Sequence, residues 1–258
     1  MLDRGIRKEI KKAGYYKFFQ KYASAFSHSD YGIINLECAA TKLSKKTPKQ
    51  FNFKADPEAL QYLKKIGISH IGLANNHSID FGSCGLSETI ENAKKSDLIT
   101  FGAGSSKEEA EKPVIIEKNG IKAAIFSSTM LRLPDYNWDT CGYYISSLLL
   151  NELSANISNY RNEHPSDFII VMLHWGWENI DIARKSQYYD AMKIINSGAD
   201  MIVGTHPHVI QNIKKINGKY VFFSIGNMIF DNNLQNGMIL KLKIFKGRKI
   251  KIKKVHCP

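Results

Sequence analysis

Short apolar segments alternate with helical stretches along this chain, and this alternation is the feature that most restricts its fold. In the first half, apolar segments are separated by two helical patterns, at 57–66 and 86–95, and these segments cover 31–36, 69–74 and 99–102. Strands that alternate with helices are typical of α/β folds. The sequence therefore predicts an α/β architecture.

The second half continues this pattern and ends in hairpins. An irregular stretch and a helix come first, and a strand, a helix and a strand follow, at 131–144, 147–162, 168–173, 185–197 and 201–203. Asn-Gly pairs favour tight turns in predicted hairpins over 114–126 and 209–225, and a Lys-Gly pair lies within a third at 238–255. Two similar halves of this kind predict a sandwich of two sheets covered by helices.

The chain has no feature that would divide it or carry it across a membrane. Its 258 residues are 43% hydrophobic and contain no repeat or long linker, so we expect a single domain over 1–258. No apolar segment approaches the roughly 18 residues of a membrane span, and the charged start at 1–12 lacks the apolar region of a signal peptide. We expect a cytoplasmic protein as the chain stands, with cell-surface association if its N-terminus is truncated.

The four cysteines and the large positive charge limit the possible redox state and binding partners of the chain. The cysteines are scattered without a close pair, which predicts free thiols: Cys38, Cys84, Cys141 and Cys257. The net charge of +12 would attract anions such as phosphates, polyglutamate, nucleic acid or anionic lipid. Much of it lies over 42–54 and 241–254, which we interpret as strands with a solvated lysine face. No recognised nucleic-acid-binding motif is present, so a nucleic-acid partner is disfavoured.

Polar side chains follow directly on predicted strands at four places. These residues are Asn35, Glu37, Asn75, Asn76, His77, His174, His206 and His208. The carboxyl ends of strands in α/β sheets converge on one ligand site, so we expect these side chains to share a cleft. Imidazole, amide and carboxylate groups together are typical ligands of Mn²⁺, Fe²⁺ and Zn²⁺. The sequence therefore predicts a divalent-metal site.

Each cluster also has a structural interpretation. A histidine such as His174, at the end of an apolar strand, is often a hydrogen-bonded core residue, and Asn75 to His77 has the composition of a turn. His206 and His208 point more strongly to function, because residues two apart in an extended segment face the same way. The combination favours a site over coincidence.

Two residues near His174 remain open between packing and function. Trp175 lines a substrate pocket in one interpretation and packs in the core in the other. Glu178 accepts a hydrogen bond from His174 in one interpretation and faces solvent in the other. We count both among the candidate supporting or substrate-binding residues, together with Asn35 and Asn75.

Five segments also carry a family resemblance along nearly the whole chain. They are Asn35-Leu-Glu37, Leu73-Ala-Asn-Asn-His-Ser-Ile-Asp80, His174-Trp-Gly-Trp-Glu178, Gly204-Thr-His-Pro-His-Val209 and Ser224-Ile-Gly-Asn-Met-Ile-Phe-Asp231. In this order they resemble the motifs of CapA-like poly-gamma-glutamate capsule synthesis proteins, in the calcineurin-like metallophosphoesterase superfamily. The resemblance implies a four-layer αββα sandwich with two divalent metal ions. It implies a catalytic role for His77 and metal-ligand roles for Glu37, Asn76, His174, His206 and His208.

The start of the chain departs from this family pattern. The family opens with a strand that ends in Gly-Asp, whose carboxylate binds a metal. Here Met1-Leu-Asp-Arg-Gly5 resembles the segment that follows that strand, so the first strand is apparently missing. Asp3 is a candidate substitute, although it comes too late in the chain to occupy the same place. We therefore expect one of the two metal positions to be weak.

The resemblance and the residues together favour a metal-dependent hydrolase. Two metal ions would activate a water molecule against a phosphoester or a related anionic ester or amide, with His77 as general acid or electrostatic stabiliser. The alternative is a non-catalytic accessory protein of capsular polyglutamate synthesis or export, acting in a capsule-synthesis membrane complex. Such a protein would hold the polyanionic polymer on its basic surface. The sequence leaves enzyme and accessory protein open.

Overall fold

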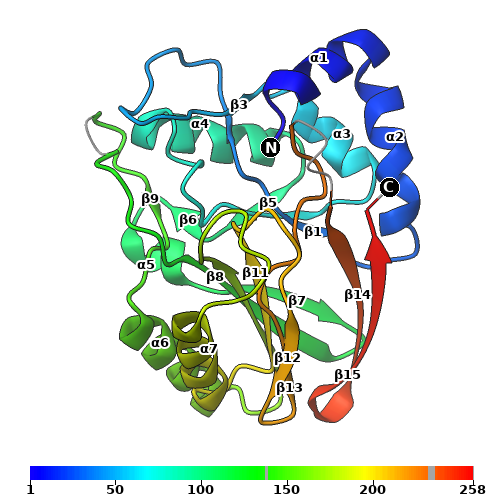
Figure 1. Cartoon of the computed structure of the whole chain (residues 1–258), viewed down its shortest axis with the longest axis vertical. Helices are drawn as coiled ribbons and strands as arrows, with labels where there is room; N and C mark the ends of the chain where they lie inside the picture. Colours follow the sequence, from blue (N-terminus) through cyan, green and yellow to red (C-terminus); the bar gives the residue numbers. More distant parts are fainter. Residues whose placement is uncertain (137–138, 232–235, 258) are drawn as a thin grey trace.

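The computed structural model describes residues 1–136, 139–231 and 236–257, and most of its strands belong to two sheets (Figure 1). The first sheet is parallel, with the order β1-β4-β5: β1 (Ile33–Asn35), β4 (His70–Gly72) and β5 (Ile99–Phe101). The second has the order β12-β13-β11-β10-β8-β7. Its strands are β7 (Val114–Lys118), β8 (Ile121–Thr129), β10 (Phe168–His174), β11 (Met201–Thr205), β12 (Ile213–Ile216) and β13 (Lys219–Phe222).

Alternation along β10 shows how the second sheet separates two apolar layers. Ile169 and Val171 belong to the cluster that includes α6 (Leu150–Glu163) and α7 (Lys185–Asn196), and Ile170 belongs to the cluster between the sheets. Successive side chains of a strand point to opposite faces, so one apolar strand serves both layers. This explains why the strand reads as a continuous apolar run.

Helices cover the outer side of the first sheet. Residues of four helices join its apolar cluster: α1 (Arg4–Ala13), α2 (Tyr15–Phe26), α3 (Ala59–Lys65) and α4 (Gly82–Lys95). The layers therefore run helices, sheet, sheet, helices, and the prediction of an α/β sandwich is confirmed (Figure 1). The short helix α5 (Lys107–Glu111) lies beside the antiparallel pair β6 (Ala103–Gly104) and β9 (Tyr144–Ile145). None of the described helices is both long and apolar enough to span a bilayer.

A separate hairpin extends the layer of the first sheet. It consists of β14 (Met238–Phe245) and β15 (Lys249–His256), joined by a short 3₁₀ turn at Lys246–Arg248. The side chains of Leu240, Leu242 and Ile252 pack against the apolar cluster between the sheets. The hairpin is thereby held against the second sheet, without a described strand pairing between it and β1.

The two lysine-rich segments that the sequence predicts to be strands differ in structure. The prediction of strands over 238–255 is confirmed, whereas the strand predicted within 42–54 is wrong except at β3 (Lys54–Ala55), which pairs with β2 (Ala39–Ala40). The intervening segment is irregular because it wraps around the buried Asp80, whose backbone carbonyl accepts from the Thr47 amide at 2.9 Å. Local composition does not reveal this long-range packing.

The N-terminal helices were not predicted, and they give Asp3 a structural role. One carboxylate oxygen of Asp3 accepts from the Arg4 amide at 2.8 Å and caps α1. The other accepts from the Lys54 amide, also at 2.8 Å. Both oxygens are therefore engaged within the fold, which corrects the proposal of Asp3 as a substitute ligand.

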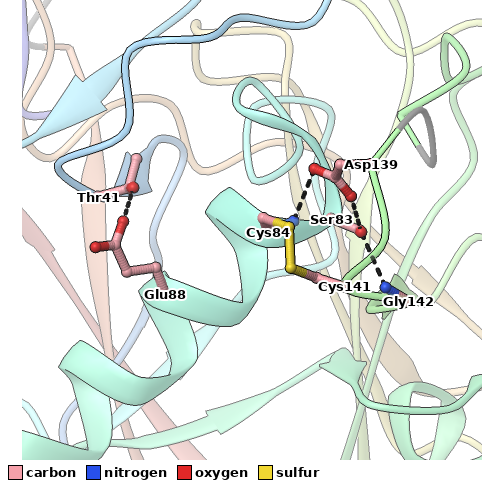
Figure 2. Close-up of a disulfide and its surroundings, with 7 residues drawn as sticks. All are labelled: Thr41, Ser83, Cys84, Glu88, Asp139, Cys141 and Gly142. Atoms are coloured by element: carbon pink, nitrogen blue, oxygen red, sulfur yellow. Dashed lines mark hydrogen bonds between the residues drawn. A yellow bond between two sulfur atoms is a disulfide. The ribbon is translucent and has the colours of Figure 1, made fainter.

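The expectation of free thiols is wrong for two of the four cysteines. Figure 2 shows the disulfide between Cys84, in the first turn of α4, and Cys141. Asp139 reinforces this connection, because it accepts hydrogen bonds from the Ser83 hydroxyl and the Cys84 amide. The partners are 57 residues apart, so their pairing depends on how the intervening chain folds and not on spacing. Cys38 and Cys257 are free thiols.

Candidate metal centre

Three histidines reach the centre from neighbouring strands of the second sheet. His174 is the last residue of β10 and lies opposite Thr205 of the parallel strand β11. His206 follows directly, and its ring centroid is 4.8 Å from that of His174 and 5.9 Å from that of His208. The segment is not extended as predicted, because His206 and His208 have φ angles of 94° and 60°. Such angles are strained for residues other than glycine and are frequent at functional sites.

The first sheet supplies an amide and carboxylate group, held together by Asn75. The Asn75 Nδ2 donates to Asn35 Oδ1 and to the Leu36 carbonyl, both at 3.0 Å. Its Oδ1 accepts from the His77 amide at 3.0 Å. Asn35 in turn donates to Glu37 Oε2 at 3.4 Å. This fully buried asparagine therefore fixes the loop after β4 relative to the end of β1.

The two groups meet across the layer between the sheets. Asn76 Oδ1 lies 2.8 Å from His174 Nε2. Glu37 Oε1 lies 3.7 Å from His174 Nε2 and 3.6 Å from His208 Nε2. One ligand atom each from Glu37, His206 and His208 lies within 4.8 Å of the others. The structure thus brings together the residues that the sequence proposed as ligands.

The outer nitrogens of two histidines have partners that set their orientation. His208 Nδ1 lies 3.0 Å from Asn227 Oδ1, while Asn227 Nδ2 donates to the His208 carbonyl at 3.0 Å. His208 therefore donates through Nδ1, which leaves the Nε2 lone pair facing Glu37. His174 Nδ1 lies 3.0 Å from the Thr205 hydroxyl oxygen, which accepts from it, while the hydroxyl itself donates to the Leu173 carbonyl at 3.3 Å. Outer partners of this kind fix the ring orientation of metal-binding histidines.

His77 is oriented by a buried ion-pair network that the sequence did not reveal. Its Nδ1 lies 2.8 Å from Asp80 Oδ2, so this nitrogen carries a proton donated to the carboxylate and Nε2 is left as the acceptor. Lys49 forms a salt bridge with Asp80 and donates to the Asn76 carbonyl at 2.6 Å. The sequence pattern places Lys49 on a solvated lysine face, and this interpretation is wrong. Its side chain is 16% exposed and balances the charge of Asp80.

Burial keeps the central histidines neutral. It lowers the pKa of His174 well below the ordinary value of 6.5, and the neighbouring His206 and His208 add repulsion against the charged form. Burial likewise lowers the pKa of His206 to about 4, with further repulsion from His208 and His77. A neutral imidazole offers a lone pair, which is the state required for metal binding.

Six buried side-chain atoms lack a hydrogen-bond partner in the described part of the chain, and two of them belong to this group of residues: Glu37 Oε1 and His206 Nδ1. Buried polar atoms of native proteins are nearly always satisfied, so an unpaired carboxylate oxygen beside neutral histidines suits the binding of a cation. Neither the amide of Asn76 nor a neutral imidazole supplies positive charge. The donor set therefore fits a divalent metal ion.

Two sequence candidates lie away from this centre. Trp175 is 1% exposed, stacks on Phe223 and donates from its indole nitrogen to the Phe223 carbonyl at 2.8 Å, so it is a packing residue. Glu178 is exposed, and the Thr205 hydroxyl holds the His174 nitrogen for which Glu178 is a candidate partner in the sequence. The strand register explains this outcome, because Thr205 lies directly opposite His174.

Several solved structures share the fold of this chain. A hypothetical protein from Thermus thermophilus matches with a TM-score of 0.59 at 13% identity, over 96% of each chain. The sulfate thiohydrolase SoxB of Thermus thermophilus matches with 0.52 at 13% identity, over 77% of this chain and 34% of the other. A 5'-nucleotidase precursor from Thermus thermophilus matches with 0.50 at 14% identity, over 77% and 40%. The chain thus shares its α/β sandwich fold with these proteins.

Sequence comparison then defines the family. The model of "Bacterial capsule synthesis protein PGA_cap" matches residues 1–232, and the chain belongs to this family. The PGA biosynthesis protein CapA of Bacillus subtilis is 30% identical over 90% of this chain, and the capsule biosynthesis protein CapA of Bacillus anthracis is 29% identical over 90%. The chain spans 61% and 58% of the length of these two relatives. The predicted membership among CapA-like proteins is confirmed.

Proposed function

We propose that this protein is a metal-dependent hydrolase of the CapA type, acting on an anionic ester or amide. The observation that carries the proposal is the unpaired, buried Glu37 Oε1 beside three histidines from another sheet. Burying a carboxylate oxygen without a cation is costly, so the fold supports this arrangement best when a metal completes it. We assign Glu37, Asn76, His174, His206 and His208 as the metal-holding residues.

The residues around the proposed metal ligands have distinct parts in the proposed reaction. Divalent ions supply Lewis-acid polarisation and activation of water when bound. Thr205 and Asn227 hold the rings of His174 and His208, so that their inner nitrogens face the centre. His77 is oriented by Asp80 through Nδ1, and Nε2, once it also carries a proton, would stabilise or protonate a leaving group. Lys49 balances the charge of Asp80 and adds positive charge beside the His77 loop.

We propose unequal affinities at two metal positions. In the described part of the chain, Glu37 is the one carboxylate within 4 Å of these histidines outside the His77–Asp80 pair. A position with a single carboxylate and neutral ligands binds a divalent ion less tightly than one with two. Metal analysis after extensive dialysis should therefore find about one ion retained per chain. Two tightly retained ions would contradict this part of the proposal.

The names of the relatives suggest a substrate class. The Bacillus relatives are named for PGA and capsule biosynthesis, so we propose a polyglutamate-related anionic polymer or a phosphoester as the substrate. Hydrolysis of p-nitrophenyl phosphate and of γ-glutamyl peptides, each with Mn²⁺ and with chelator, tests the proposal. Metal-dependent turnover of either one, lost in Glu37→Gln, supports it. Retained activity in that variant would assign the turnover to another source.

A non-catalytic accessory role is the second candidate, and the basic hairpin favours it. Lys243, Lys251 and Lys253 are exposed on one face of the β14–β15 hairpin. Such a surface attracts polyanions without chemistry. Salt-sensitive binding of polyglutamate with no turnover under any metal condition would favour this role over hydrolysis.

A further inference from the structure

A small cavity lies beside the proposed metal centre, where the loops after β8 and β10 meet the start of α7. Its volume is about 260 Å³, which suits one residue or a small group of a larger ligand. The Met130 amide, on its wall, donates to the His174 carbonyl at 3.0 Å. The Asn179 amide, in the loop after β10, donates to the Pro207 carbonyl at 2.8 Å. Both loops of the cavity are therefore attached to the segments that carry the proposed histidine ligands.

Gly176 shapes the loop that follows β10. Its φ of 89° favours glycine, and a Cβ there would lie 2.8 Å from Gln187 Nε2. Gln187 is buried, and its Oε1 accepts from the Arg184 amide at 3.0 Å, at the start of α7. Across this turn, Trp175 is buried and Trp177 is 58% exposed. The loop therefore brings Trp177 to the surface, where its ring lies against the Arg184 side chain.

Two arginines line this cavity without an acidic partner. The Arg184 guanidinium lies 3.5 Å from the centroid of the Trp177 ring, and Arg132 comes from the loop after β8. In the described part of the chain, no carboxylate oxygen lies within 4 Å of either guanidinium, and the arginines that form ion pairs are Arg7, Arg161 and Arg248. A guanidinium stacked on an aromatic ring keeps its fork of N–H donors, which matches the two oxygens of a carboxylate. The two arginines therefore suit an anion.

Asp190 adds a carboxylate to the same cavity. It is partly buried, and burial raises its pKa, against a smaller opposing effect of Lys193. Because this carboxylate has lost part of its hydration, a hydrogen-bond donor beside it would be favourable. The cavity therefore offers donors for an anion and, more than 4 Å from them, an acceptor for an N–H group.

We propose that this cavity binds one glutamyl residue of a γ-linked chain, beside the residue whose bond lies at the metal centre. The inference rests on the proposed function and adds a binding site for the substrate chain. Arg132 and Arg184 bind the α-carboxylate, and Asp190 accepts from the N–H group on the same carbon. A γ-linked residue carries both groups on one carbon. An α-linked residue uses its α-carboxylate in the chain, so its free carboxylate lies at the end of the side chain.

Binding measured without metal tests this site separately from hydrolysis. The probe is a γ-linked glutamate tetramer, added to the full chain in chelator and followed at the Trp177 indole resonance by NMR. Arg132→Gln combined with Arg184→Gln should weaken binding at least about tenfold, because charge-assisted hydrogen bonds are lost. Lys94→Gln combined with Lys95→Gln, in the last turn of α4, removes the same charge elsewhere and should weaken binding less than about threefold. Equal weakening by both pairs, or no binding to the wild type, would overturn the proposal.

Two further measurements separate recognition of the residue from attraction of charge. An α-linked glutamate tetramer carries the same charges and should bind at least about tenfold more weakly than the γ-linked one. Asp190→Leu removes a negative charge, so plain attraction of an anion predicts tighter binding. The proposal predicts weaker binding, by about threefold or more, because an acceptor is lost. Equal affinity for the two tetramers, or tighter binding by Asp190→Leu, would overturn it.

The outcomes also distinguish this proposal from the hydrolase assignment. Selective binding of the γ-linked tetramer, without turnover under any metal condition, would support the binding site and contradict hydrolysis. Metal-dependent turnover of p-nitrophenyl phosphate, without binding of the tetramer, would support hydrolysis and overturn the binding site.

Discussion

The two sides of the metal centre are built with unequal support. On the histidine side, β10 is paired along seven residues with β8 and along five with β11, so His174 ends a strand held from both directions. On the other side, β1 has three residues and, among the described strands, pairs with β4 alone, and Asn35 ends it beside a cavity. The proposed histidine ligands therefore lie on a rigid frame, whereas the proposed charged ligand, Glu37, follows a short strand.

The difference in strand pairing suggests that the histidine side of the centre is preorganised and that the Glu37 side adjusts more easily. Strands that are paired on both sides open only with the global unfolding of a sheet, whereas edges exchange and shift more easily. The histidine positions should consequently be the same with or without metal. If the backbone shifts and changes the affinity for metal, the change should come from displacement of Glu37 and Asn35. Variants on the two sides therefore measure different properties.

The largest expected effect on metal binding is its loss in His206→Ala. In chelator the variant should unfold at nearly the wild-type temperature, because His206 follows a strand and its Nδ1 makes no hydrogen bond in the described structure. With excess Mn²⁺ the wild type should gain about 2.7 kcal/mol at 100 times its Kd, and the variant should gain almost none. His208→Ala should likewise lose metal-dependent hydrolysis. A variant that is already unstable in chelator yet gains normally from Mn²⁺ would identify His206 as a packing residue.

The next effect concerns the disulfide that ties the Cys141 loop to α4 (Figure 2). Replacing both Cys84 and Cys141 by Ser opens a loop of 57 residues and should cost about 4 kcal/mol of unfolding free energy. Urea unfolding with and without reductant measures it, and reductant should leave the double variant unchanged. Because α4 follows the loop of His77 and Asp80, we expect weakened order on that side, with β10 unaffected. Equal stability of wild type with and without reductant would contradict a formed disulfide.

Particular elements show what the sequence was able to predict. Periodic apolar segments located β10 almost to the residue, and the polar residues after those segments converge in the structure. The pattern did not reveal α2, whose aromatic residues suit either helix or strand. Lys49 and Thr205 were missed for a different reason. Their roles depend on contacts with residues 27 and 31 positions away, which local composition does not encode.

A pH titration of the chelated protein sharpens the comparison on the histidine side. His206 has an ordinary pKa of 6.5 in the unfolded chain and a pKa of about 4 in the folded chain. Between these values the unfolded chain binds a proton that the folded chain does not, so stability falls as the pH is lowered. The difference corresponds to about 3 kcal/mol at about 1.4 kcal/mol per pH unit. Urea unfolding at pH 7 and pH 4 should show this loss, and His206→Ala should reduce it. An identical loss in both proteins would place the titrating group elsewhere.

The smallest expected effect isolates a single partner on the rigid side. Thr205→Val keeps the shape of the side chain and removes the hydroxyl that lies 3.0 Å from His174 Nδ1. The ring should then lose its fixed orientation, and metal affinity should fall by about 10–100-fold, as for other outer partners of metal-binding histidines. Thr205→Ser keeps the hydroxyl and should retain nearly full affinity. Calorimetric titration with Mn²⁺ measures both variants, and thermal unfolding in chelator shows whether the fold is intact. If Thr205→Val retains nearly full affinity, the hydroxyl does not position the ring, and His174 is held by its strand alone.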